Sequence, residues 1–76
     1  IIVRVVDSSG SPARQERVWV HIYHPSASRS RDRYADNHGE AEFSLDIDSG
    51  AEISVSVRGT QFVSRAPAQE HYQIQL

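Results

Sequence analysis

Hydrophobic and polar residues alternate with a period of two along most of this chain, which is the spacing of side chains on a β-strand. Residues 41–47 (AEFSLDI) and 53–58 (ISVSVR) show the pattern most clearly. Two turn sequences that contain Asp and Gly, residues 36–39 and 48–50, bound the first of these stretches. We therefore expect residues 41–47 and 53–58 to form a β-hairpin.

The same pattern predicts further strands on both sides of this region. Residues 1–6 are mostly β-branched and apolar on both faces, and residues 17–23 alternate again. Shorter strands are expected at residues 62–65 and 71–76. Residues 24–33 (HPSASRSRDR) are rich in Ser and Arg and contain a Pro, so we expect a mobile surface loop there.

No segment has helical periodicity over the ten or so residues that a helix needs. Short strands with frequent turn signals predict an all-β fold, a small antiparallel β-sandwich of about seven strands. The residues expected to form its core are apolar and share the inward positions of their strands. They are Ile1, Val3, Val5, Val18, Val20, Ile22, Phe43, Leu45, Ile53, Val55, Val57, Tyr72, Ile74 and Leu76.

The overall composition limits the function classes. The chain has 76 residues and no cysteine, which predicts one small domain over residues 1–76 without disulfides. A net charge of −2 argues against nucleic-acid binding, and no apolar run reaches the ~18 residues of a membrane span. Because the chain begins with Ile1, we interpret it as a piece of a larger protein.

Four short motifs resemble those of a known group of β-sandwich domains. Residues 5–12 (VVDSSGSP) and 18–20 (VWV) resemble the V-x-D-x-x-G-x-P … V-x-V opening of carboxypeptidase regulatory-like (prealbumin-like) domains. Residues 35–43 (ADNHGEAEF) and 53–59 (ISVSVRG) resemble the hairpin and strand that follow in these domains. Bacterial Ig-like repeats and adhesin repeats share much of this pattern, so the resemblance implies a small Ig-like or prealbumin-like sandwich.

What the resemblance implies for function is an accessory role, because members of this group serve as spacers, stabilising appendages, carbohydrate binders or docking surfaces. The matching residues are turn and core positions, which carry fold and not activity. Ala35 replaces the Thr that usually precedes the Asp. The chain has no Lys, which excludes the self-made isopeptide bond of some adhesin repeats.

The candidate binding site lies on one strand. Trp19, His21 and Tyr23 share its outward face with Arg17, and Trp19 and Tyr23 are expected roughly 13 Å apart. Two aromatic side chains at this spacing suit a protein partner or a flat sugar. Alternatively, the Ser/Arg loop or a neighbouring domain covers this face.

A larger apolar patch follows if the first strand lies beside residues 17–23. In that arrangement Ile2 and Val6 would extend the surface of Trp19 and Tyr23. A patch of this kind on so small a domain would indicate a protein interface.

Neither a metal site nor a catalytic site is expected. Zinc needs three or four converging ligands, and His21 and His24 would lie on opposite faces of a strand. Oxygen ligands for calcium are present at turns, but capping of the backbone explains them better; these residues are Asp36, Asn37, Asp46 and Asp48. There is no cysteine nucleophile and no Gly-x-Ser-x-Gly motif, so we expect no enzyme activity and no cofactor.

Two functions remain. The first is a non-catalytic accessory module, a structural spacer or protein-docking domain of a larger bacterial protein that is exported to the periplasm, the cell surface or the extracellular space. Its partners would be other domains of the parent chain or a separate protein. The second is a carbohydrate-binding module that uses Trp19 and Tyr23 as its platform.

Overall fold

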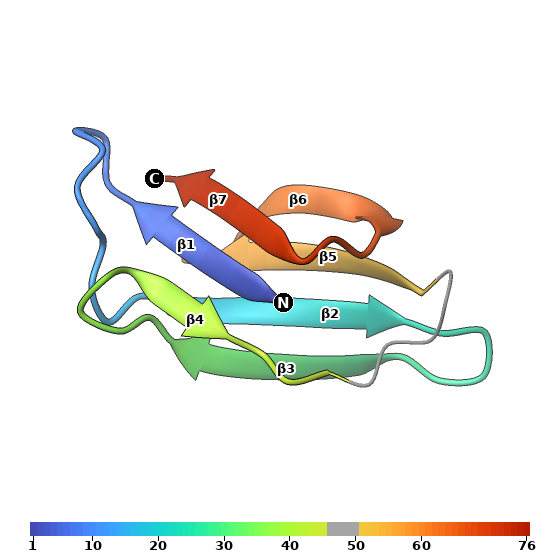
Figure 1. Ribbon diagram of the computed structural model, residues 1–76. Helices are drawn as coiled ribbons and strands as arrows, with labels where there is room; N and C mark the ends of the chain where they lie inside the picture. The colour runs from blue at the N-terminus through green and yellow to red at the C-terminus, as the bar shows by residue number, and fades with distance from the viewer. Residues whose placement is uncertain (46–50) are drawn as a thin grey trace.

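The structure, a computed structural model, describes residues 1–45 and 51–76 and contains seven strands in two sheets (Figure 1). No described residue is helical, so none belongs to a helix long and apolar enough to cross a membrane. The strands are β1 (Ile2–Val6), β2 (Arg17–Tyr23), β3 (Arg29–Tyr34), β4 (Glu40–Glu42), β5 (Glu52–Val57), β6 (Thr60–Pro67) and β7 (His71–Gln75).

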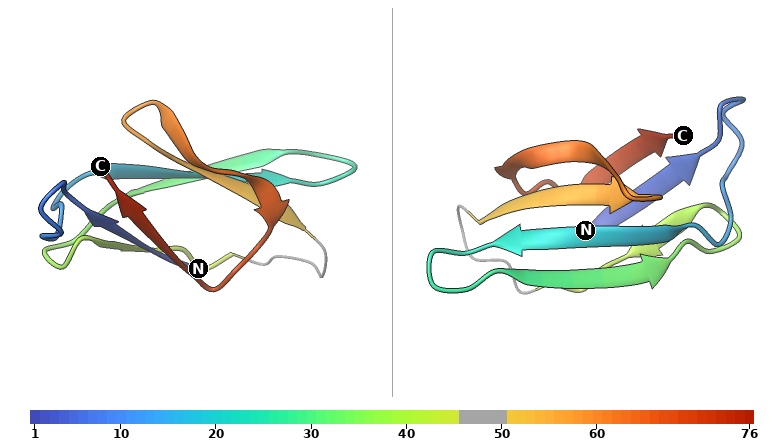
Figure 2. Two further views of the ribbon diagram at one scale, coloured as in Figure 1. Left: turned by 90° about the horizontal axis from the view of Figure 1, so that it is seen from above. Right: turned by 180° about the vertical axis from the view of Figure 1, so that it is seen from behind.

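The two sheets pack face to face, as the view from above in Figure 2 shows. One sheet has four strands in the order β3-β2-β5-β6, and the other has three in the order β4-β1-β7. The all-β sandwich of seven strands is therefore confirmed. All strand pairs are antiparallel except β1 and β7, which run parallel because the chain crosses from the four-stranded sheet into the other one before β7.

The core lies between the sheets and follows from the period of two. Inward side chains of β2 and β5 meet those of β1, and Val20, Val55 and Val3 are fully buried. Phe43 and Ile74 also belong to the core, and only 3% and 2% of their surface is exposed. Every residue predicted for the core is buried or packs against it; the structure adds Ala41, which the sequence-based list omits.

The predicted hairpin between residues 41–47 and 53–58 is wrong. β4 pairs with β1, whereas β5 pairs with β2 and β6 in the opposite sheet. Alternation shows which face of a strand is buried, but it does not specify which strand lies beside it in the sheet. The turn at residues 48–50 lies outside the described residues.

The structure also places a strand where a mobile loop was expected. β3 covers the second half of residues 24–33 and pairs with β2 over six residues, from Arg17 opposite Tyr34 to Ile22 opposite Arg29. All six residues of β3 are exposed, so its sequence lacks the alternation of hydrophobic and polar residues that would predict a strand. Main-chain hydrogen bonds to β2 define this strand.

The carboxylates of Asp7 and Asp36 organise two turns, which confirms that Asp36 caps a turn. Asp7 Oδ1 accepts hydrogen bonds from the main-chain N–H groups of Ser9 (2.9 Å) and Ser11 (3.0 Å). Asp36 Oδ1 likewise accepts from the N–H groups of His38 (2.8 Å) and Glu40 (3.1 Å). The pKa of Asp7 lies below its ordinary value of 3.8 because the Ser9 hydroxyl, which donates to Oδ1 at 2.6 Å, and the main-chain N–H of Ser11 favour the ionised carboxylate. The pKa of Asp36 lies below 3.8 because the N–H groups of Glu40 and His38 do the same.

The Asp36 turn is also where two segments approach most closely. Gly39 has a φ of 76°, and a Cβ added there would lie 2.5 Å from the carbonyl oxygen of Val5. The Val5 N–H donates to the Gly39 carbonyl at 2.7 Å, so neither backbone can move away without losing this bond. Gly59 has a similar φ of 75° in the β5–β6 hairpin turn, but no atom lies within 4 Å of a Cβ there.

We expect Gly39→Ala to lower the free energy of unfolding by about 3 kcal/mol or more, because it adds a clash with backbone to an unfavourable φ. Gly59→Ala, the matched control, should lose only about 1 kcal/mol, from φ alone. Urea denaturation of both variants measures the difference. Equal losses would contradict the close packing of the Asp36 turn against β1.

The two turn carboxylates should make stability depend on acid pH. A pKa that is lower in the folded state gives stability that is complete above the unfolded value of 3.8 and is lost as pH falls through the lower folded pKa. We expect the double variant Asp7→Asn, Asp36→Asn to lose less stability than the wild type when pH falls from 5 to 2. Asn keeps the accepting oxygen but does not titrate. Parallel pH profiles for the two proteins would contradict the assignment.

Candidate docking face

The predicted site residues do share one surface, the outward side of β2. Arg17, Trp19, His21 and Tyr23 alternate with inward residues of the core, and the three ring-bearing side chains are half-buried. β2 lies inside the four-stranded sheet, with β3 on one side and β5 on the other. The row therefore crosses the middle of the sheet's outer face.

Cationic and aromatic groups contact one another along this row. The Arg17 guanidinium carbon lies 4.4 Å from the centroid of the Trp19 ring and 5.9 Å from that of Tyr34. The His21 ring stacks near Trp19, with centroids 6.5 Å apart and an interplanar angle of 12°. Arg65 of β6 lies 4.5 Å from the ring centroid of Tyr23. Contacts of this type are favourable by roughly 0.5–1 kcal/mol each at exposed positions.

Polar groups on the neighbouring strands fix the row from both sides. On the β3 side, Arg17 Nε donates to Asp32 Oδ2 at 2.7 Å, and His21 Nδ1 is hydrogen-bonded to Ser30 Oγ at 2.8 Å.

We call the combined surface the docking face and define it by its outward side chains. These are Arg17, Trp19, His21, Tyr23, Tyr34 and Arg65.

On the β5 and β6 side, Arg65 Nε donates to Glu52 Oε1 at 2.9 Å. The Tyr23 hydroxyl and Ser54 Oγ are hydrogen-bonded at 3.1 Å. Ser54 is fully buried even though its register partner His21 is an outward residue of β2. Its burial indicates that side chains of the docking face pack closely over the sheet.

Sequence reasoning missed two members of the docking face. Tyr34 is 65% exposed and lies opposite Arg17 in the register of β2 and β3. Arg65 reaches Tyr23 from β6, across β5. Both depend on strand neighbours, and the Ser/Arg-rich segment gave no signal that β3 exists.

The larger apolar patch suggested for Ile2, Val6, Trp19 and Tyr23 is wrong. β1 pairs with β4 and β7, so Ile2 lies in the opposite sheet from β2. Val6 is only 4% exposed, because the chain after β1 folds back and Pro12 forms a bridge with it.

The chemistry of the docking face suits non-covalent recognition. It offers aromatic edges, guanidinium groups and a histidine whose Nδ1 already has a partner. In the described ranges, 1–45 and 51–76, no three His, Asp or Glu side chains come together as a metal ion would need.

Comparison with known proteins places the chain in a family. The family model of the macroglobulin domain MG4 matches residues 1–75. Comparison with curated proteins and with solved structures gives no significant match. The motif resemblance indicated the Ig-like β-sandwich correctly but pointed to the carboxypeptidase regulatory-like group, because turn and core residues are common to many such sandwiches. The chain belongs to the family of macroglobulin MG4 domains, accessory domains that occur within larger proteins.

Proposed function

We propose that this MG4 domain is a non-catalytic module of a larger, exported protein and that it docks against a neighbouring domain or a partner protein through its docking face. The observation that carries the proposal is the row of cationic and aromatic side chains on β2. Arg, Trp and Tyr are the residue types that most often dominate binding energy at protein interfaces. Here they lie on β2, an inner strand of the four-stranded sheet.

The hydrogen bonds beneath the row support this proposal. Arg17 and Arg65 are each held by a carboxylate of a neighbouring strand, Asp32 and Glu52 respectively. Side chains already ordered in the free protein lose less conformational entropy when a partner binds. A partner that covers most of the docking face would therefore contact side chains whose positions are already fixed by hydrogen bonds.

The geometry favours a protein over a glycan. A sugar platform needs an open aromatic ring face, but the Arg17 guanidinium lies over Trp19. Tyr23 has Arg65 over its ring in the same way. A protein partner can instead contact the ring edges and the outer sides of both guanidinium groups. Carbohydrate binding stays the second candidate because Trp19 and Tyr23 share one face.

We expect the double variant Trp19→Ala, Tyr23→Ala to destabilise the domain by ~2 kcal/mol more within the parent protein than in the 76-residue chain, because only the parent supplies the docked partner. Thermal unfolding of both forms measures this difference. Ile2→Ala with His71→Ala, on the outer face of the other sheet, is the matched control.

The control variant should have the same effect in both forms. An equal loss of stability for Trp19→Ala, Tyr23→Ala in the chain and in the parent would contradict docking through this face. In that case Trp19 and Tyr23 would stabilise only the domain itself.

The glycan alternative is tested on the 76-residue chain, in which Trp19 is the single tryptophan. We expect the emission maximum of Trp19 and its quenching by acrylamide to stay unchanged when neutral and acidic oligosaccharides are added. A blue shift with one oligosaccharide that is abolished by Tyr23→Ala would favour the carbohydrate-binding function instead.

A further inference from the structure

The outer edge of β3 is open. β3 is the first strand of its sheet and pairs only with β2, and no other described segment lies along its free edge (Figures 1 and 2). It is six residues long and contains neither Gly nor Pro. An edge strand of this kind presents main-chain N–H and C=O groups that another strand can pair with.

Three arginines lie at alternate positions along this edge. Arg29, Arg31 and Arg33 are opposite Ile22, Val20 and Val18 of β2, so they occupy the core side of the sheet. They remain exposed because the facing sheet ends at the short strand β4 on this side. Consecutive arginines of the row are roughly 7 Å apart, the repeat of an extended chain.

No described carboxylate neutralises this row. Asp32, the acidic residue of β3, lies on the other face and accepts the hydrogen bond from Arg17. Among the described residues, the carboxylates that form ion pairs belong to Asp32, Glu16 and Glu52, and their partners are other arginines. Within residues 1–45 and 51–76, the row is therefore a local excess of positive charge, in a chain whose net charge is −2.

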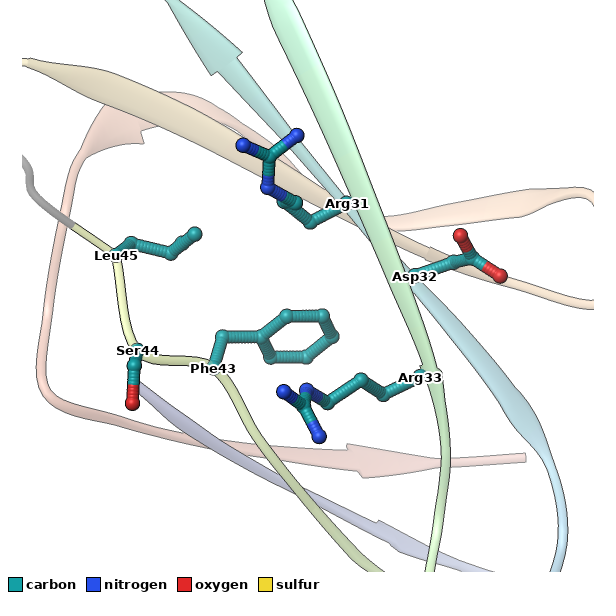
Figure 3. A pocket seen from close by; sticks show the side chains of 6 residues that line it. All are labelled: Arg31, Asp32, Arg33, Phe43, Ser44 and Leu45. Carbon is teal, nitrogen blue, oxygen red and sulfur yellow. The ribbon is translucent and has the colours of Figure 1, made fainter.

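A hollow of about 290 Å³, lined by both polar and apolar residues, adjoins the row. Residues Arg31, Asp32 and Arg33 of β3 line one side of it, and Phe43, Ser44 and Leu45, from the segment after β4, line the other. Figure 3 shows the Phe43 ring directed towards β3 between the two arginines, while Asp32 points away. A bound segment could thus contact the arginine row and, beside it, the partly exposed side chain of Leu45.

We propose that the free edge of β3 binds an extended acidic segment of a partner protein, which adds a fifth strand to the sheet β3-β2-β5-β6. In such a strand, every second side chain faces the arginine row, at the same repeat as the arginines themselves. Glu or Asp at these positions would lie beside Arg29, Arg31 and Arg33, whose planar guanidinium groups suit carboxylates. This surface is separate from the docking face, and its test is independent of it.

Charge and geometry favour this occupant over two others. A second copy of the domain pairing through β3 would bring arginine rows together, and like charges on adjacent strands are destabilising. A sulfated glycan would match the charge but would leave the main-chain edge unpaired. An acidic strand satisfies the charge, the spacing and the open hydrogen-bonding groups together.

The experiment uses the 76-residue chain and a short capped peptide in which Glu alternates with Thr. We expect binding to slow the hydrogen exchange of main-chain amides in β3. Arg31→Gln with Arg33→Gln should weaken the peptide by ~10-fold or more, because paired charges are lost at the contact. Arg4→Gln with Arg14→Gln, which removes the same charge elsewhere, should weaken it by less than ~2-fold at physiological salt.

Two further ligands separate strand addition from simple attraction of charge. A peptide of the same composition with its Glu residues in one block should bind more weakly, and so should a copy of the alternating peptide with N-methylated amides. Equal affinity for all three peptides would overturn the proposal. So would a sulfated oligosaccharide that binds through Arg31 and Arg33 while the alternating peptide does not.

Discussion

The structure depends on the burial of alternate Val and Ile side chains between two sheets. Val18, Val20, Val55 and Val57 lie at the centre of this layer and are fully buried. Each such side chain contributes about 1.5–3 kcal/mol on transfer from water. A chain of 76 residues without cysteine has no disulfide to add to this, so the fold depends strongly on the packing of this core.

The same constraint creates the docking face. Because β2 gives every second residue to the core, its other side chains must lie on the outer side of the sheet. There Arg17 and Trp19 contact each other, and Asp32 and Ser30 of β3 bond the row in place. The exposed strand β3 thus serves two surfaces: one face supports the docking face and the other carries the arginine row.

The sequence alone predicted which residues are buried, but it did not predict which strands pair with one another. The core residues and the shared face of Trp19 and Tyr23 follow from a period of two, and the structure confirms both. Which strands pair does not follow from that period, so the hairpin of residues 41–47 with 53–58 was wrong. β3 was missed because none of its six residues is buried. Tyr34 and Arg65 could be assigned to the face only with the strand order known.

Docking through the outward row of β2 requires that this row is covered when the domain is in place in its parent protein. Hydroxyl-radical footprinting reports the solvent access of Trp19 and Tyr23 individually, in the 76-residue chain and in the parent. We expect both side chains to be oxidised more slowly in the parent protein, while the oxidation of His71, on the other sheet, changes little. Equal oxidation of Trp19 and Tyr23 in the two forms would contradict docking through this row.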